Sequence, residues 1–321
     1  MNNDSAINEQ GVALKVEKLA KRYGDLVALD GVSFHVRRGE IFAYLGPNGA
    51  GKTTTVNILS GLLGRDGGKV MICGYDLDRD PIRVKEIIGV VPDESNLYPE
   101  LSCKRNLEYL GELYGISRVK RQLQREKLLT MFGLQDKATV PFQGLSKGLK
   151  RRLTIAAALV HEPEILFLDE PTTGLDVPSA RYLRQLLMEI NGNGTTVLLT
   201  THNMFEADEL AHRLGILIKG RLVTTGTPEE IRKLAEQRER LEVVFSQKVG
   251  ARELLQNCTA VTGVVMKDNT AILAVANLDE ALRQIVTYAG AHGVKIVNVV
   301  SMPPSLEEAF LSLLQSHQEV A

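Results

Sequence analysis

One Gly-rich stretch decides the fold of this chain: Gly46-Pro47-Asn48-Gly49-Ala50-Gly51-Lys52-Thr53-Thr54. It fits the phosphate-loop pattern G-x-x-x-x-G-K-[ST]. Glycines let the backbone bend so that several N–H groups point at a polyphosphate, which a Cβ atom would obstruct. Lys52 would place a positive charge on the β- and γ-phosphates, and the Thr53 hydroxyl would ligate Mg²⁺.

The sequence on either side of this stretch has the pattern that a phosphate loop requires. Residues 41–45 form a short apolar run that predicts a strand, and residues 54–63 place Val56 and Leu59 at helical spacing. A helix that begins at Lys52 would add its positive N-terminal end to the site. A strand, a phosphate loop and a helix in this order predict a nucleotide-binding α/β fold.

Composition narrows the class of protein. The chain has 321 residues, enough for two domains, and its net charge of −1 gives no indication of a nucleic-acid partner. Cys73, Cys103 and Cys258 are widely spaced, which disfavours zinc, iron–sulfur and disulfide sites and favours a reducing compartment. Residues 1–11 are expected to be disordered, with no signal-peptide core. No window approaches the roughly 20 apolar residues of a membrane span, so we expect a soluble protein.

Two carboxylates follow a second apolar run. Residues 165–168 are apolar, and Asp169 and Glu170 come directly after them. A strand that delivers an aspartate at its carboxyl end brings an acid to the Mg²⁺ shell of phosphate-loop enzymes. Glu170 would point the other way on a pleated strand and could orient a water molecule. The alternative is an acidic strand end that faces solvent, and the phosphate loop upstream makes it the weaker one.

Two further residues stay ambiguous from the residues alone. His202 follows a strand predicted at residues 196–200, where ligands of α/β nucleotide folds bind. A histidine at a strand end is nevertheless more often a structural hydrogen-bonding group. Tyr23 lies upstream of the phosphate loop and could stack on an adenine, although such aromatic residues usually pack against the core or its rim.

The remaining hydrophobic pattern predicts further strands and helices in alternation. Strands are expected at residues 12–16, 26–29, 32–36, 69–72, 87–91, 216–218 and 222–224, and helices at residues 103–132 with a break at 115–117, at 154–160 and at 177–190. The charges along residues 103–132 are typical of a solvated helix face.

The pattern changes after residue 226. Residues 227–240 begin with a capping box and are expected to form a charged linker helix. Residues 241–321 predict strands and helices in the order βαββαβ, which is that of a ferredoxin-like unit, and then an amphipathic helix. This accessory domain has no clustered His, Cys or carboxylate residues, so a regulatory or oligomerising role is favoured over chemistry.

Five motifs make residues 12–226 resemble the nucleotide-binding subunit of an ATP-binding-cassette (ABC) transporter. Besides the phosphate loop they are the strand that ends in Asp169 and Glu170, the signature Leu145-Ser146-Lys147-Gly148-Leu149, the seam loop Thr173-Gly174-Leu175-Asp176, and His202. The resemblance implies a phosphate-loop NTPase cassette with a mixed sheet core, an antiparallel β subdomain and a helical subdomain at about residues 93–150.

The resemblance also implies an ATP and Mg²⁺ site at the seam of a head-to-tail homodimer. Glu170 would polarise the attacking water and His202 would sense the γ-phosphate, as the catalytic residues. Mg²⁺ would be held by Thr53, Asp93 and Asp169. The residues that bind ATP would be Tyr23 at the adenine, Gly46, Asn48, Gly49, Ala50, Gly51, Lys52, Thr53 and Thr54 in the loop, and Ser146, Gly148 and Asp176 at the seam.

Two departures from the family pattern bear on turnover. The family signature is usually Leu-Ser-Gly-Gly-Gln, and here Lys147 and Leu149 replace a Gly and the Gln. Asp93 stands where the family usually has a Gln that touches Mg²⁺ and the attacking water. A carboxylate can still bind Mg²⁺, but it adds negative charge and cannot donate a hydrogen bond as an amide does.

Softer patterns resemble the ABC-2-type exporter branch: the sequence at residues 146–148, the loop at 97–99 and the tail at 304–310. This branch implies an ABC-2-type permease as partner, a cytoplasmic location at the inner face of the cell membrane, and export of a small molecule, ion or polysaccharide. The alternative is a soluble ABC ATPase that acts on nucleic acid or ribosomes, against which the single cassette and near-neutral charge count. A small-molecule phosphoryl transferase is weaker, because it leaves the signature unexplained.

Overall fold

The computed structural model describes residues 11–234, 239–302 and 305–318. Apart from Gly11, the disordered start predicted at residues 1–11 lies outside the described residues, as does the first residue of the 304–310 tail. Contacts divide the chain into two compact units, Met1–Pro228 and Glu229–Ala321, and each unit has its own hydrophobic core. Within the described residues, no helix combines the length and the apolar character needed to cross a membrane.

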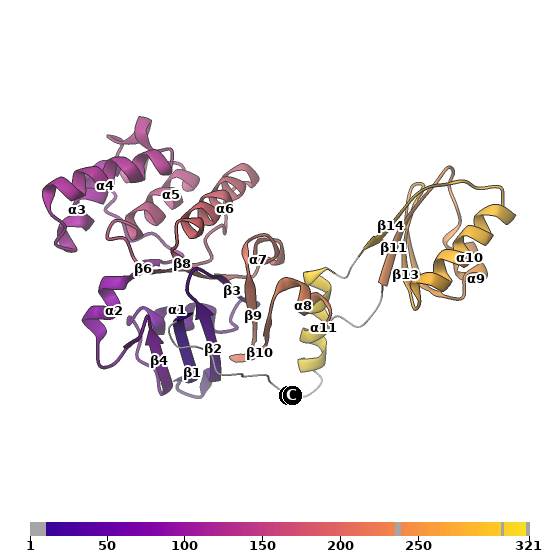
Figure 1. Ribbon diagram of the computed structural model, residues 1–321, viewed down its shortest axis with the longest axis horizontal. Helices are drawn as coiled ribbons and strands as arrows, with labels where there is room; N and C mark the ends of the chain where they lie inside the picture. Colours follow the sequence, from indigo (N-terminus) through magenta and orange to yellow (C-terminus); the bar gives the residue numbers. More distant parts are fainter. Residues whose placement is uncertain (1–10, 235–238, 303–304, 319–321) are drawn as a thin grey trace. The chain divides into compact units, whose positions relative to one another are not determined.

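A six-stranded sheet runs through the first unit (Figure 1). Its order is β10-β9-β3-β8-β7-β6, and every neighbouring pair is parallel except β9 with β10. Every residue of β3, β7 and β8 is buried, as expected for parallel strands covered on both faces. The strands are β3 (Ile41–Leu45), β6 (Ile88–Val91), β7 (Ile165–Asp169), β8 (Thr196–Thr201), β9 (Arg213–Ile218) and β10 (Arg221–Gly226).

A second, antiparallel sheet in this unit has the order β2-β1-β4-β5. Its strands are β1 (Val12–Tyr23), β2 (Leu26–Arg37), β4 (Gly67–Ile72) and β5 (Tyr75–Asp76). The short strands predicted between residues 12 and 36 are therefore two long ones. Gly31, which the sequence suggested as a strand end, has a φ of 68° and lies inside β2, where a register shift against β1 absorbs it as a bulge.

Helices connect the strands of this unit: α1 (Lys52–Leu59), α2 (Pro81–Ile87), α3 (Cys103–Leu113), α4 (Arg118–Met131), α5 (Lys147–Ala158), α6 (Val177–Gly192) and α7 (Met204–Leu210). Figure 1 shows α3, α4 and α5 grouped at one end of the unit, away from β1, β2 and β4. The predicted break between α3 and α4 falls at Gly115, which has a φ of 69°. Helix α5 begins earlier than the predicted 154–160 helix, because the Ser146 side chain caps it by accepting a hydrogen bond from the Leu149 N–H.

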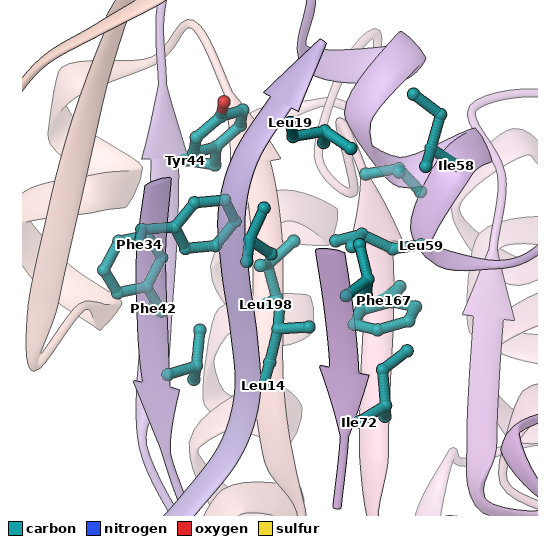
Figure 2. Packing of buried hydrophobic residues seen from close by; sticks show 14 of the residues in the cluster. Leu14, Leu19, Phe34, Phe42, Tyr44, Ile58, Leu59, Ile72, Phe167 and Leu198 are labelled. Atoms are coloured by element: carbon teal, nitrogen blue, oxygen red, sulfur yellow. The ribbon is translucent and has the colours of Figure 1, made fainter. Parts of the chain in front are cut away.

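The core of the first unit joins the two sheets and α1 (Figure 2). The Phe34 ring of β2 stacks on the Phe42 and Tyr44 rings of β3, with centroids 5.5 and 5.2 Å apart. Ile58 and Leu59 of α1 are fully buried in the same cluster. Burying each such side chain contributes about 1.5–3 kcal/mol, so the helix that follows the phosphate loop is firmly attached to the sheet.

The second unit contains an antiparallel sheet of order β12-β13-β11-β14. This arrangement confirms the predicted ferredoxin-like unit. From Pro228 onward the elements are α8 (Pro228–Arg232), β11 (Glu239–Phe245), α9 (Ala251–Asn257), β12 (Val261–Lys267), β13 (Thr270–Val275), α10 (Leu278–Ala291), β14 (Ile296–Met302) and α11 (Leu306–Gln318).

The linker helix predicted at residues 227–240 is wrong at its C-terminal end. Helix α8 ends at Arg232, residues 235–238 lie outside the described residues, and the strand β11 has begun by Arg240. The reason is the period-two pattern of β11, whose Leu241, Val243 and Phe245 are buried in the core of the second unit. This strand pattern overrides the helical preference of the charged residues before it.

Candidate functional site

Three neighbouring strands of the six-stranded sheet end at one edge. Strand β3 lies beside β8, and β8 lies beside β7, all parallel. The chain leaves these three ends into the loop at residues 46–51, into His202 and into Glu170, respectively. Because the carboxyl ends of parallel strands share an edge, the predicted phosphate loop, histidine and carboxylate come together there.

The loop has glycine where nothing larger fits. A Cβ atom at Gly46 would lie 2.5 Å from the Leu217 carbonyl oxygen, and one at Gly51 would lie 2.6 Å from the Ala28 carbonyl oxygen. Gly51 also has a φ of 108°, which residues with a side chain rarely adopt. Helix α1 begins directly after it, and no side chain caps that helix. The loop and the first turn of α1 therefore fit a chain of phosphates.

The other ATP-binding residues predicted in this loop differ in exposure: Asn48, Gly49 and Thr53 are exposed, Thr54 is half-buried and Ala50 is buried. The Ala50 N–H donates to the Pro47 carbonyl at 3.2 Å and so closes a turn of the loop. Thr53, the predicted Mg²⁺ ligand of the loop, is thus open to solvent.

Replacing Gly51 with alanine is expected to lower the free energy of unfolding by about 2–3 kcal/mol, because the new Cβ would meet the Ala28 carbonyl at a strained φ. Mg-ATP affinity should fall by about tenfold or more as the loop shifts. Thermal unfolding and nucleotide titration measure the two effects. The control is Gly192→Ala in α6, where a Cβ meets nothing within 4 Å. Unchanged nucleotide affinity in the Gly51 variant would contradict the proposal that the loop at residues 46–51 binds the phosphates.

The Glu170 carboxylate contacts three other side chains. Its Oε1 lies 3.1 Å from Lys52 Nζ, and its Oε2 lies 2.8 Å from His202 Nδ1 and accepts a 3.0 Å hydrogen bond from the Thr173 hydroxyl. Lys52 Nζ also donates to the Gly46 carbonyl at 2.7 Å. The side chains of Lys52 and Glu170 are 6% and 13% exposed, so little solvent screens their ion pair. An ammonium, a carboxylate and an imidazole thus form one continuous contact chain.

The alternation of side chains along a strand, which the sequence predicted, does not set the direction of the Glu170 side chain. Strand β7 ends at Asp169, so strand alternation does not extend to Glu170. Glu170 has a φ of 48°, and its N–H donates to the Thr200 carbonyl at 3.2 Å and to the Thr200 hydroxyl at 3.1 Å. A left-handed backbone costs about 1–2 kcal/mol at a residue with a side chain, and such strain gathers at functional sites. This turn aims the carboxylate at Lys52.

Thr200 and Arg151, which the sequence did not single out, hold Asp169. The Asp169 side chain is buried, and its Oδ1 accepts a 2.5 Å hydrogen bond from the Thr200 hydroxyl. Arg151 of α5 donates to the carbonyls of Asp169, Pro92 and Pro171 at 2.6, 2.5 and 2.9 Å. Burial lowers the pKa of the Arg151 guanidinium, although an arginine stays charged in proteins. Arg151 lies in a basic run, and nothing in that pattern indicates burial.

The signature and the seam loop meet at the N-terminal ends of two helices. Ser146 caps α5, and Asp176 caps α6 by accepting a 2.8 Å hydrogen bond from the Ser179 N–H. Hydrogen bonds from Ser179 hold the pKa of Asp176 below its usual range. A Cβ atom at Gly148 would lie 2.7 Å from the Ser179 hydroxyl. Glycine at position 148 therefore lets the two helix ends approach closely.

Lys147, one of the two departures from the family signature, turns back onto its own chain. Its Nζ occupies the space in which a Cβ of Gly174 would lie, and Gly174 has a φ of 69°. The ammonium therefore lies over the seam loop of the same subunit. Because Gly174 has no side chain, there is space for the Lys147 ammonium at this place.

Asp93 and Tyr23 are exposed, near the ends of β6 and β1. The Tyr23 side chain has a ring centroid 5.5 Å from Lys21 Nζ. No group of three or more His, Cys, Asp or Glu side chains in the described part of the chain could hold a metal ion. Mg²⁺ at Thr53, Asp93 and Asp169 would therefore take further ligands from phosphates and water. The roles of these residues stay predictions.

The glycine loop, the strand-end carboxylates and the capped signature helix define a phosphate-loop ATP-binding cassette. Residues 29–173 match the ABC transporter family, and residues 226–314 match the C-terminal domain of DrrA1-3-like ATP-binding proteins. The chain is 38% identical over 312 residues to the daunorubicin resistance ATP-binding protein DrrA3 of Streptomyces coeruleorubidus, covering 96% of this chain and 98% of that protein. It belongs to the ATP-binding proteins of ABC transporters, a family whose cassettes hydrolyse ATP.

Other relatives and solved structures agree with this family. The chain is 32% identical over 306 residues to the linearmycin resistance ATP-binding protein LnrL of Bacillus subtilis (strain 168), covering 94% of this chain and 97% of that protein. A solved ATP-binding subunit of an ABC transporter has a TM-score of 0.63 at 32% identity, covering 69% of this chain and 92% of the solved one. A dimeric cassette in a post-hydrolysis state, bound to ADP and Pi, has a TM-score of 0.61 at 29% identity over 67% and 98%. The predicted cassette fold is confirmed.

Proposed function

We propose that this chain is the ATP-hydrolysing subunit that powers a separate ABC-2-type membrane permease from the inner face of the membrane. It would work as a head-to-tail homodimer with ATP and Mg²⁺ at the seam, and would serve to export a small molecule, ion or polysaccharide. Relatives named for daunorubicin resistance and linearmycin resistance support an export role. A Nod factor export ATP-binding protein of Paraburkholderia xenovorans (strain LB400), 43% identical over 220 residues, with coverage of 68% and 72%, supports it as well.

The observation that carries the catalytic part of the proposal is the contact chain from Lys52 through Glu170 to His202. It brings together Lys52 as the proposed phosphate-binding cation, Glu170 as the proposed general base and His202 as the proposed hydrogen-bond donor. In phosphoryl transfer the protein contributes chiefly positioning and charge stabilisation, and these groups suit that task. The contact chain lies directly beside the glycine loop, through the 2.7 Å hydrogen bond from Lys52 to Gly46.

In the proposed reaction the ATP phosphates lie in the glycine loop and against the first turn of α1. Lys52 stabilises their negative charge, and Glu170 orients the attacking water and takes its proton. His202, held against Glu170, is placed to donate to the γ-phosphate. Bound Mg²⁺ would neutralise charge on the β- and γ-phosphates, and Thr53, Asp93 and Asp169 are the residues that would hold it.

The second half of the site would come from the other copy of the chain. Ser146 and Gly148 lie at the N-terminal end of α5, whose positive dipole end favours an anion such as the γ-phosphate. Lys147 and the seam loop of the same copy lie next to them, which adds positive charge near the seam. ATP bound between the two copies would therefore draw them together.

The loop after β6 is suited to transmit this closure to the permease. At its start, Arg151 ties the Pro92 carbonyl to the Asp169 carbonyl at the ATP site. Further along, the fully buried Asn106 donates to the Tyr98 carbonyl at 3.1 Å and accepts from the Tyr98 N–H at 3.0 Å. The loop is thus held rigidly while the Tyr98 side chain is 46% exposed. An exposed aromatic on a rigid loop suits contact with a partner protein.

The homodimer is tested by measuring the mass of the Glu170→Gln variant in solution with and without Mg-ATP. We expect a monomer without nucleotide and a dimer at saturating Mg-ATP, since the variant should bind ATP but hydrolyse it very slowly. Adding Ser146→Arg to the same chain is expected to abolish the dimer, because the larger side chain would obstruct the seam at the α5 end. A dimer that is already present without ATP would instead assign dimerisation to the second unit.

A further inference from the structure

A buried carboxyl group lies on α7, the helix that follows His202, and the mechanism above does not use it. Glu206 of α7 is 0% exposed, and neither of its oxygens makes a hydrogen bond within the described part of the chain. The hydroxyls of Thr172 and Thr201 lie beside it. Asn203 caps α7 and accepts hydrogen bonds from the N–H groups of Phe205 and Glu206, which fixes the backbone at this carboxyl. An unpartnered buried carboxyl is costly and calls for an explanation.

The two threonines beside this carboxyl lead directly to the groups that hold the catalytic carboxylate. Thr172 precedes Thr173, whose hydroxyl donates to Glu170 Oε2 at 3.0 Å. Thr201 precedes His202, whose Nδ1 lies 2.8 Å from the same oxygen. The segment after β7 and the C-terminal end of β8 with His202 thus come close at two places, once at Glu170 and once at the buried carboxyl.

We propose that Glu206 is a positioning residue of the ATPase site, which braces Thr172 and Thr201 so that the residue after each of them holds Glu170 in place. The inference rests on the catalytic role proposed for Glu170. Because Glu206 is buried and has no contact with solvent, it acts through these neighbours and not on the nucleotide itself.

The environment favours the protonated form of this carboxyl. Burial raises the pKa of Glu206, the Thr201 and Thr172 hydroxyls oppose this rise, and the nearby Glu170 carboxylate adds to it. A protonated carboxyl has one donor and one free acceptor oxygen. It can therefore donate to one threonine hydroxyl and accept from the other after a small rotation.

The cations near this carboxyl are committed to other partners. Arg184 of α6 lowers the pKa of Glu206 only as the smallest of its influences, and its guanidinium forms an ion pair with Glu209. Arg151 of α5, the other nearby cation, donates to backbone carbonyls. Neither arginine serves as a dedicated counter-ion for Glu206, which agrees with a neutral carboxyl.

The test compares Glu206→Ala and Glu206→Gln in the full chain by steady-state ATP hydrolysis. The alanine variant is expected to lower kcat by about 10- to 100-fold with KM for ATP within about threefold, because a misplaced Glu170 affects the reaction more than binding. The glutamine variant should keep kcat within about threefold, since its amide is neutral and has a donor and an acceptor. Asp208→Ala, on the exposed side of α7, is the control and should leave both constants unchanged.

A second measurement follows the thermal midpoint Tm against pH. Because burial raises the pKa of Glu206, the folded chain holds this proton to a higher pH than the unfolded chain, which releases it above a pKa of about 4.3. The stability of the natural chain therefore falls as the pH rises from the unfolded pKa towards the folded one. Glutamine has no proton to release. The Tm of the Glu206→Gln variant is therefore expected to rise relative to that of the natural chain as the pH increases above about 4.3.

The outcomes separate this inference from the proposed function. Wild-type kcat in Glu206→Ala, beside an inactive Glu170→Gln variant, would overturn the positioning role and leave Glu170 as the base. Equal losses of kcat in the glutamine and alanine variants would overturn the inference that Glu206 acts as a neutral carboxyl. An active Glu170→Gln variant would instead overturn the catalytic assignment itself. Should the alanine variant not fold, the kcat and the Tm trend of Glu206→Gln decide.

Discussion

Replacing Glu170 with glutamine is expected to lower steady-state ATP hydrolysis by about 100-fold or more, the usual contribution of a general base. An amide cannot take the proton of the attacking water. The affinity for ATP should not fall by more than about threefold, because the glycine loop and Lys52, the proposed phosphate-binding groups, are both retained, and Lys52 loses only its ion pair with Glu170. Phosphate release at saturating Mg-ATP and equilibrium nucleotide titration measure the two quantities.

A matched control for this variant is Glu164→Gln. Glu164 lies directly before β7, its side chain is 44% exposed, and it pairs with Arg38. The same chemical change at this distance from the site should leave hydrolysis within about twofold, since exposed ion pairs contribute little. Near-normal turnover in Glu170→Gln would remove Glu170 from the mechanism and point to another group, such as Asp93, as the base.

Replacing Arg151 with methionine is expected to lower the free energy of unfolding of the first unit by about 2–4 kcal/mol. Methionine fills much of the same space but donates no hydrogen bond, so the carbonyls of Pro92, Asp169 and Pro171 would lose their donor in a buried place. Hydrolysis should fall as well, because the segments that follow β6 and β7 would lose the donor that they share. Thermal unfolding and phosphate release on the same sample measure both effects.

The control for this variant is Lys150→Met, the neighbouring residue on α5. Lys150 Nζ lies 5.5 Å from the Phe142 ring centroid and its loss should change the free energy of unfolding by no more than about 1 kcal/mol. If the Arg151 and Lys150 variants unfold at the same temperature, the hydrogen bonds of Arg151 to the segments that follow β6 and β7 contribute little to stability.

The sequence predicted those parts of the fold that short-range patterns encode. The loop at residues 46–51 could be identified because its glycines, lysine and threonine stand at set spacings beside an apolar strand. The ferredoxin-like order of the second unit followed from period-two runs such as Leu241, Val243 and Phe245. Where a long strand carries a bulge, as β2 does at Gly31, the sequence predicts two short strands, because a glycine alone does not reveal a register shift.

The supporting residues of the site could not be predicted in this way. Arg151 stands in a run of basic residues and Glu206 on a short acidic helix, and both patterns are typical of exposed surfaces. Their burial depends on how α5 and α7 pack against strand ends far away in the sequence. The aim of Glu170 depends on one left-handed φ angle, for which its residue type gives no signal. Side-chain environment, and not motif spacing, decides these roles.

The pairing of Lys52 with Glu170 has a consequence for the timing of the reaction. One oxygen of Glu170, the proposed base, pairs with the same ammonium that a nucleotide phosphate would attract. If a phosphate drew Lys52 Nζ away, Oε1 would lose its counter-ion and be free to accept a hydrogen bond from water. Nucleotide binding and the release of the Glu170 carboxylate from Lys52 would then be a single event. Such a coupling would discourage the carboxylate from activating water before there is a phosphate to attack.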